Sequence, residues 1–409
     1  MGSLINKRVL LGVTGGIAAY KSADLVRRLR DAGAEIRVIM TRSATEFITP
    51  LTLQAVSGHP VHQHLLDTNA EAGMGHIELA RWADAVLVAP ASANFLARLA
   101  QGRADDLLSA VCLATEAPVA VAPAMNQQMW NNAATQSNLA VIRKNAVRIF
   151  GPAEGSQACG EVGPGRMLEP VELVTLASQL FATGELDGLT VLVTAGPTWE
   201  AIDPVRGLTN RSSGKMGYAV AEAAAESGAR VILVSGPTSL PDPERVRTLR
   251  VESAQEMHDT VHQHATEADI FIGVAAVADY RPVRAAAQKI KKTEETMVLE
   301  LERTPDILAS VAALRPAPFT VGFAAETDNL EQHARAKLES KKLDLVAANR
   351  VGADIGFAAD ENSLLLVERE GVTELATQPK TKLARALIHH IAAKYRAKNA
   401  AKVHRLRRP

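Results

Sequence analysis

The chain has 409 residues, enough for two or three domains that each bury a hydrophobic core. Hydrophobic residues make up 47% and charged residues 22%, a balance that excludes a wholly disordered chain. Lysine plus arginine and aspartate plus glutamate both total 45, so no overall charge draws the chain to nucleic acid or to a membrane surface.

The cysteine content and the hydropathy pattern predict where the protein works. Two cysteines cannot form a disulfide framework, and such usage suits a reducing compartment. No secretory signal precedes the first strand-like run, and no apolar run approaches the ~18 residues that a membrane span needs. We therefore expect a cytoplasmic protein without membrane or nucleic-acid partners, and we assign no role to the basic stretch Lys402–Pro409.

Short apolar runs alternate with helical patterns through the first half of the chain. Strands are expected at Arg8–Thr14, Ala34–Thr41, Ala85–Pro90, Val119–Pro123 and Val147–Phe150. Helices are expected at Ala18–Ala32, Ser92–Ala100, Ala104–Ala114 and Ala133–Lys144. Such alternation predicts a parallel sheet covered on both faces, with ligands beyond the carboxyl ends of its strands. The segments expected to meet at that crevice are Thr14–Ile17, Thr41–Ser43, Pro90–Asn94 and Pro123–Asn126.

A second α/β unit follows a helix at Val171–Ala182 and the polar linker Thr183–Gly188. Its strands are expected at Thr190–Thr194, Arg230–Ser235, Ile270–Ala275, Thr320–Phe323 and Leu343–Asn349, with Ser363–Glu368 as an edge hairpin strand. The fold class is therefore α/β, with two tandem three-layer domains at 1–188 and 189–409 and mainly parallel sheets.

The first glycine-rich turn favours a mononucleotide over NAD. Gly12–Gly16 reads G-x-x-G-G, which is not the dinucleotide fingerprint, and no acidic residue ends the second strand. Hydroxyls and an arginine stand there instead, and they suit a terminal phosphate, as do the backbone amides of a helix start. FMN is such a ligand. We predict flavin contacts at Thr14, Gly15, Gly16, Ile17, Thr41, Ser43, Ser92 and Asn94.

Three further residues are candidates for chemistry in this half. His76 stands at a helix start, Asn126 follows a strand, and Cys159 lies in the glycine-rich segment Ala158–Arg166. Taken singly, a lone histidine is more often structural and an asparagine often forms a turn. The segment around Cys159 contains too many turn residues for a core, so we expect a mobile loop with a reactive thiol. Cys112 lies in an amphipathic stretch and is expected to be a buried apolar residue.

The order of the motifs decides between these readings. GGIAAYK, MGHIELARWAD, APASANFLARLAQGRADDLLS, PAMNQQMW and SQACGEVGPGRML together resemble the flavin-dependent cysteine decarboxylases that act on 4'-phosphopantothenoylcysteine. The resemblance implies a flavodoxin-like fold, in which oxidation of the substrate's cysteine moiety to a thioaldehyde makes loss of the carboxylate easy. It implies that Cys159 protonates the enethiol formed, that His76 is the catalytic histidine, and that Asn126 binds the substrate carboxylate.

The second half carries a polar loop that is not a P-loop. In DPVRGLTNRSSGKMG the glycines Gly207 and Gly214 are too far apart for the phosphate-binding P-loop spacing, although a polar loop before a helix still suits an anion. Asp279 at a strand end, with lysines nearby, suits a triphosphate with bound Mg²⁺, because a carboxylate holds the metal and ammonium groups neutralise phosphate oxygens.

TAGPT, DPVRGLTNRSSGKMG, AAVADY, KIKK and TPDIL resemble the CTP-using bacterial phosphopantothenate–cysteine ligases, so this half is expected to be Rossmann-like. The resemblance implies an acyl-cytidylate that cysteine converts to an amide. It implies that Asn210 contacts this intermediate, that Lys289 acts in its formation, and that Asp279 holds Mg²⁺. CTP contacts are implied at Gly273, Val274, Ala275, Asp279, Lys289, Thr304, Pro305, Asp306, Ile307, Phe323, Lys337 and Lys341.

Over nearly its full length the chain thus resembles the bifunctional bacterial proteins of coenzyme A biosynthesis. That resemblance implies a homo-oligomer, a dodecamer with a trimer-based decarboxylase core and paired ligase domains. Two alternatives stay open at this point. An NAD-linked oxidoreductase lacks its fingerprint here, and a non-catalytic flavoprotein regulator would be favoured by loss of the loop cysteine, which is present as Cys159.

Overall fold

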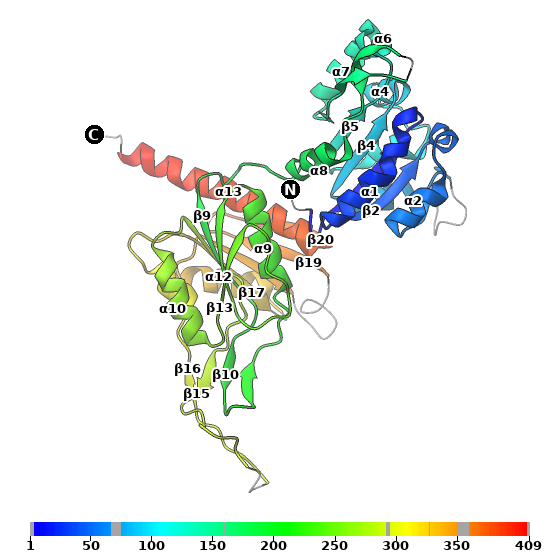
Figure 1. Ribbon diagram of the computed structural model, residues 1–409. Coiled ribbons are helices and arrows are strands. Elements are labelled where there is room, and N and C mark those ends of the chain that lie inside the picture. The colour runs from blue at the N-terminus through cyan, green and yellow to red at the C-terminus, as the bar shows by residue number, and fades with distance from the viewer. Residues whose placement is uncertain are drawn as a thin grey trace. The chain divides into compact units, whose positions relative to one another are not determined.

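The protein is described from a computed structural model that covers residues 4–66, 75–158, 160–291, 295–326, 328–350 and 360–406, with 401–406 described by backbone alone. The chain forms two compact units, Met1–Phe181 and Ala182–Pro409 (Figure 1). Both are α/β units built on mainly parallel sheets, which confirms the predicted fold class.

The first unit is built on a parallel sheet with strand order β3-β2-β1-β4-β5-β6. Without the two-residue β3, the order is that of flavodoxin-like folds, and it reverses between β1 and β4. The strands run β1 (Arg8–Val13), β2 (Glu35–Met40), β3 (Val61–His62), β4 (Ala85–Ala91), β5 (Val119–Pro123) and β6 (Arg148–Ile149). All but β3 were expected from the sequence, because strands buried on both faces read as continuous apolar runs.

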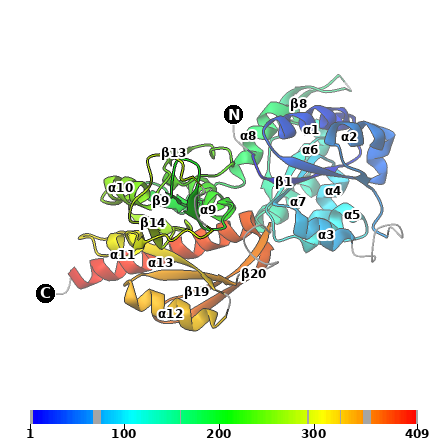
Figure 2. The same ribbon diagram turned by 90° about the horizontal axis from the view of Figure 1, so that it is seen from below.

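Helices cover both faces of this sheet (Figure 2). Successive residues of β1 point to opposite faces, so Val9 and Leu11 pack beneath α1 and α8 while Leu10 packs with α4 and α5 on the other side. The helices are α1 (Lys21–Asp31), α2 (Pro50–Ser57), α3 (Gly75–Trp82), α4 (Ala93–Ala100), α5 (Leu107–Ala114), α6 (Gln127–Asn131), α7 (Ala133–Lys144) and α8 (Pro170–Gln179). Two short 3₁₀ turns, η1 (Ile17–Tyr20) and η2 (Arg42–Glu46), follow β1 and β2.

The glycine-rich segment after β6 is not the loop that we predicted. Strands β7 (Ala153–Ser156) and β8 (Val162–Arg166) pair as an antiparallel hairpin, so residues 162–166 form a strand where we predicted an irregular loop. Gly165 has φ +135°, and a Cβ there would lie 2.3 Å from the Met125 carbonyl oxygen. The glycine therefore allows a close backbone approach. Cys159 itself lies outside the described residues.

The second unit has one large sheet in the order β13-β12-β9-β14-β17-β18-β19-β20. Its first six strands are parallel and follow the Rossmann order, which reverses between β9 and β14. The strands run β9 (Thr190–Ala195), β12 (Arg230–Ser235), β13 (Val246–Arg250), β14 (Ile270–Gly273), β17 (Phe319–Glu326), β18 (Leu345–Arg350), β19 (Glu361–Val367) and β20 (Val372–Pro379).

The predicted edge strand at Ser363–Glu368 is not at the edge. It corresponds to β19, which pairs with β18 on one side and β20 on the other. The hairpin was correctly expected, but β20 was missed because its sequence VTELATQP is largely polar and exposed. The opposite edge strand, β13 with the sequence VRTLR, was missed for the same reason.

Five helices of the described residues cover the sheet of the second unit. Helices α9 and α13 share a core with Val191 and Val193, while α10 and α11 pack against Leu192 on the other face. Helix α12 packs against Val346 and Ala348, on that same other face. The helices run α9 (Lys215–Glu226), α10 (Ala254–Ala265), α11 (Ile307–Ala312), α12 (Leu330–Ser340) and α13 (Lys380–Leu406). Among the described residues, no helix is both long and apolar enough to cross a membrane.

In the described part of this unit there are also two small antiparallel ribbons. One pairs β10 (Trp199–Ala201) with β11 (Gly207–Thr209), and the other pairs β15 (Tyr280–Pro282) with β16 (Leu301–Arg303). The chain that joins β15 to β16 runs out beyond the ribbon as a narrow extension, at the lower end of the unit in Figure 1. This extension carries Lys289, the first residue of the KIKK motif.

Candidate active sites

The first candidate site lies at the carboxyl ends of β1 and β4, where the strand order of the first unit reverses. The Thr14 hydroxyl donates to the Pro90 carbonyl oxygen at 2.9 Å and accepts from the Ser92 amide at 2.9 Å. Ser92 in turn caps α4 by accepting from the Phe95 amide at 3.3 Å. Two of the segments predicted to meet at the crevice are thus joined directly.

The loop after β1 comes close to the loop after β2. A Cβ on Gly15 would lie 2.4 Å from the Cβ of Ser43, so the two backbones approach too closely for any side chain at Gly15. The Thr41 hydroxyl donates to the Val13 carbonyl oxygen at 3.4 Å, which ties β2 to β1 at the same edge. A Cβ on Gly16 would meet nothing within 4 Å, and Ile17 is 62% exposed. Backbone amides beside open space suit an entering phosphate.

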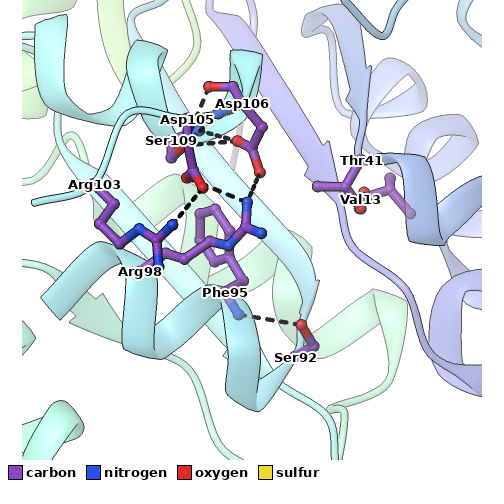
Figure 3. A network of polar contacts seen from close by, with 9 residues as sticks. All are labelled: Val13, Thr41, Ser92, Phe95, Arg98, Arg103, Asp105, Asp106 and Ser109. Atoms are coloured by element: carbon purple, nitrogen blue, oxygen red, sulfur yellow. Dashed lines mark hydrogen bonds and ion pairs between the residues drawn. The ribbon is translucent and has the colours of Figure 1, made fainter. Parts of the chain in front are cut away.

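A charged network that the sequence analysis missed supports α4 (Figure 3). Arg98 pairs with Asp106 at 2.8 Å and with Asp105 at 3.3 Å, and Arg103 pairs with Asp105 at 2.7 Å. Asp106 also caps α5 by accepting from the Ser109 amide at 2.8 Å. The network joins the end of α4 to the start of α5. The sequence GRADD could have predicted this helix cap, since acidic residues before an apolar run are typical of a helix start.

His76 and Asn126 occupy different parts of this unit. His76 is the second residue of α3, and among the described residues its buried Nδ1 atom has no hydrogen-bond partner. A buried polar atom without a partner fits a site that a further group completes. Asn126 caps α6 and donates through Nδ2 to the Glu161 carboxylate at 2.6 Å, beside the β7–β8 hairpin. Glu161 was not singled out from the sequence. Asn94 lies exposed in the first turn of α4.

Cys112 packs against the hydrophobic cluster under α3, α4 and α5, as expected. The residue is only partly buried as a whole, but burial of the thiol raises its pKa to about 12. It therefore carries no thiolate at neutral pH, and its chemistry is that of an apolar side chain.

The second candidate site is a cavity of about 880 Å³ at the carboxyl ends of β9 and β14. Every residue predicted to contact CTP lines it except Lys289. Asn210 lines it too, and its Nδ2 donates to the carbonyl oxygens of Val277 at 3.0 Å and Ala276 at 3.3 Å. The lining has six lysines and arginines against two aspartates, so the cavity attracts anions.

One end of the cavity carries two lysines of α12 and its C-cap. Lys337 donates to the Phe323 carbonyl oxygen at 2.7 Å, and Lys341 pairs with Asp306 at 2.9 Å. Burial lowers the pKa of Lys337, and the neighbouring Lys341 ammonium lowers it further. Burial would raise the pKa of Asp306, but the Ala309 amide and Lys341 outweigh it, so the pKa lies below its usual value. Asp306 is thus an anion that caps α11 and holds Lys341 in place.

Asp279 lies at the mouth of this end. Its carbonyl oxygen accepts from the Thr304 amide at 3.1 Å, and its side chain is exposed. Asp279 and Asp306 are the acidic residues of the lining, and the described residues hold no cluster of three metal-ligating side chains. A magnesium ion bound with nucleotide phosphates needs only one or two carboxylates, so this donor set fits such an ion.

Lys289 lies outside the cavity of its own chain. It is exposed on the extension between β15 and β16. The base of that extension is held by Asp203, whose carboxylate accepts from the Ile290 amide at 3.1 Å and pairs with Arg206 at 2.6 Å. Burial would raise the pKa of Asp203, but these hydrogen bonds outweigh it and hold the pKa well below its usual range.

Comparison with known proteins matches a separate family model to each of the two units. The family model described as Flavoprotein matches residues 2–182, and that described as DNA/pantothenate metabolism flavoprotein C-terminal domain matches residues 186–395. The coenzyme A biosynthesis bifunctional protein CoaBC of Vibrio vulnificus is 56% identical over 96% of this chain and 98% of its own length. The chain belongs to this family.

Other members are similar over the same span. The protein of that name from Escherichia coli K12 is 52% identical over 97% of this chain and 99% of its own, and that from Bacillus subtilis is 46% identical over 95% and 98%. The resemblance drawn from the motifs is confirmed. The chain is a bifunctional enzyme of coenzyme A biosynthesis with a flavoprotein half, so the alternatives of an NAD-linked oxidoreductase and a non-catalytic regulator are not retained.

Proposed function

We propose that the C-terminal unit joins 4'-phosphopantothenate to L-cysteine at the expense of CTP, and that the N-terminal unit decarboxylates the product to 4'-phosphopantetheine with FMN. The observation that supports this most is that one cavity is lined by all the predicted CTP contacts but Lys289. We assign the two activities to residues 1–188 and 189–409, and the linker Thr183–Gly188 lies next to the division of the structure after Phe181.

The ligation proceeds in two displacements, because a carboxylate at neutral pH is a poor acyl electrophile. A carboxylate oxygen attacks the α-phosphorus of CTP, the bond to the β-phosphate bridge breaks, and diphosphate leaves with its electron pair. The amine of cysteine then attacks the acyl carbon and CMP leaves. We propose that Lys289 neutralises the charge that builds up on the leaving diphosphate and that Asp279 binds Mg²⁺. Asn210 contacts the acyl-cytidylate intermediate.

Decarboxylation needs an electron acceptor next to the cysteine moiety, and a bound FMN supplies it by oxidising that moiety and returning the electrons at the end. Thr14, Gly15, Gly16, Ile17, Thr41, Ser43, Ser92 and Asn94 would hold the cofactor. Asn126 orients the substrate carboxylate, with Glu161 holding its amide group. We assign His76 as the catalytic histidine, and we assign Cys159 as the residue that delivers the proton to the enethiol carbon.

We propose a cytoplasmic homo-oligomer, built from a trimeric decarboxylase core, most simply a dodecamer, with paired ligase units. Two features support an assembly. Lys289 lies outside the cavity of its own chain, and apolar side chains such as Val298, 93% exposed, stand on the extension that carries it. A neighbouring subunit would both cover these side chains and receive Lys289.

The proposal is tested by supplying purified protein with CTP, 4'-phosphopantothenate and cysteine, then measuring diphosphate, CMP, carbon dioxide and 4'-phosphopantetheine. Cys159→Ser should still release diphosphate and carbon dioxide but accumulate the enethiol, because its last proton donor is missing. Cys112→Ala is the matched control, since that thiol is buried. A Cys159→Ser variant that forms 4'-phosphopantetheine at the normal rate would contradict the assignment, and a colourless wild-type protein would contradict the flavin.

A further inference from the structure

The ligase cavity has a second cationic end, away from Lys337 and Lys341. Lys215 and Lys380 line it together with Asn349 and Asn362, and we call these four residues the lysine corner. Lys215 is the first residue of α9, and Lys380 is the first residue of α13. Lys215 ends the polar loop that the sequence suggested for an anion, whereas Lys380, Asn349 and Asn362 were not singled out.

The two cationic ends lie on opposite faces of the sheet. Helix α12 packs against Val346 and Ala348 of β18, whereas α9 and α13 share a core with Leu345 and Ala347 of the same strand. Alternate residues of a strand point to opposite faces, so these helices approach the carboxyl edge of the sheet from different sides. The cavity therefore passes over the strand ends from one positive region to another.

The lysine corner has the properties of an anion site. Lys380 is 7% exposed, and burial lowers its pKa, with a further contribution from the Lys215 ammonium. Asp360 links the two residues, because its carboxylate pairs with Lys215 at 2.6 Å and its carbonyl oxygen accepts from the Lys380 amide at 2.9 Å. That carboxylate is 85% exposed, so an ion pair of this kind is weak and a multiply charged anion can replace it.

Asn362 adds hydrogen-bond donors to this charge. It is 8% exposed, and its Oδ1 accepts from the Ser363 amide at 3.0 Å, which leaves the Nδ2 protons to donate. Two ammonium groups and an amide that converge on one end of a cavity match the oxygens of a phosphate group.

We propose that the lysine corner binds the phosphate monoester of the acid substrate. The inference rests on the ligation proposed above, in which the acid carries a carboxylate at one end and a dianionic phosphate at the other. If the nucleotide occupies the Lys337 end, the carboxylate must meet its α-phosphorus near Asn210, beyond β14. The phosphate then extends to the far end of the cavity, where its binding fixes the carboxylate for attack without taking part in the chemistry.

The test compares 4'-phosphopantothenate with pantothenate, which lacks the phosphate. Diphosphate release is measured for wild type, Lys215→Gln, Lys380→Met and the control Lys342→Gln. Saturating CTP gives kcat/KM for each acid, and varied CTP gives the KM for CTP. Lys342 is exposed and does not line the cavity. The preference for the phosphorylated acid, as a ratio of kcat/KM values, should fall about 10- to 100-fold in each corner variant, as expected for a lost hydrogen bond to a charged group. The KM for CTP and the rate with pantothenate should stay unchanged.

Two results would overturn the proposal. One is an unchanged preference for the phosphorylated acid in Lys215→Gln. Because the Lys215 side chain is half-exposed, this substitution should not disturb folding, so misfolding would not explain such a result. The other is a raised KM for CTP with an unchanged preference, which would place nucleotide phosphates at the corner. Calorimetric binding of the two acids gives a readout without turnover. If wild type releases no diphosphate, the proposed ligation is wrong. The calorimetric difference in affinity between 4'-phosphopantothenate and pantothenate then still tests the phosphate site, because the corner variants should lose that difference.

Discussion

At the scale of single residues, Gly15 shows how a missing side chain builds the flavin site. A Cβ there would lie 2.4 Å from the Ser43 Cβ and 2.8 Å from the Ser43 carbonyl oxygen. Gly15→Ala should force the two loops apart and weaken flavin binding by about tenfold or more, since such overpacking costs about 1–3 kcal/mol. The measurement is flavin absorbance per chain after dialysis. Gly371→Ala is the control, because a Cβ there meets nothing within 4 Å. Equal flavin retention in both variants would show that the loops adapt.

Asn210 and Lys289 separate the two displacements of the ligation. Asn210 lies in the cavity beside Ala276 and Val277, where its amide is positioned for the acyl intermediate. Asn210→Asp should therefore let the acyl-cytidylate form and accumulate. Lys289→Gln should suppress diphosphate release itself, because the missing cation acts on the first transition state. Quenched reactions analysed for diphosphate, CMP and the intermediate distinguish the two. Equal loss of all three in both variants would mean that both residues serve one step.

At the scale of elements, α13 stabilises the second unit through its buried face. Leu387 is 0% exposed and packs in the core shared with α9. Leu387→Ala should lower the free energy of unfolding of this unit by about 2–5 kcal/mol, the range for large-to-small changes in a core. Thermal unfolding is followed by calorimetry, which detects both units, and by flavin fluorescence, which reports the first unit only. The midpoint of the flavin signal should stay unchanged. Val372→Ala at the exposed edge strand is the control. A similar loss in both variants would mean that α13 is not a core element.

At the scale of the whole molecule, the position of Lys289 outside its own cavity predicts a shared active site. If Lys289 enters the cavity of the neighbouring subunit, a mixed dimer of Asn210→Asp and Lys289→Gln chains holds one site with both defects and one with neither. Random pairing of equal amounts should then restore about a quarter of wild-type ligation. The activity of each variant alone is the control. No recovery after subunit exchange, verified by mass spectrometry, would place Lys289 in its own chain's site.

The sequence by itself determined the parts of this protein that depend on local pattern. Strands such as β4 and β12 are buried on both faces, so they read as apolar runs whose bounds could be predicted within a residue or two. The ordered motifs identified the family, and the turn after β1 excluded an NAD fingerprint. Residues that follow strand ends, such as Thr14 and Ser92, were placed at a site because parallel strands end at one edge.

Only the tertiary structure decided which distant side chains meet. The lysine corner joins α9 to α13 across more than a hundred residues, and no motif of the sequence contains both lysines. The contact of Asn126 with Glu161 and that of Asp203 with Ile290 likewise depend on how loops fold back. Exposed strands such as β20 were missed because their side chains are largely polar, so these strands lack the apolar run from which a buried strand is predicted. Local pattern reports burial, whereas convergence of polar groups is set by the packing of the whole unit, and no short stretch of sequence contains that packing.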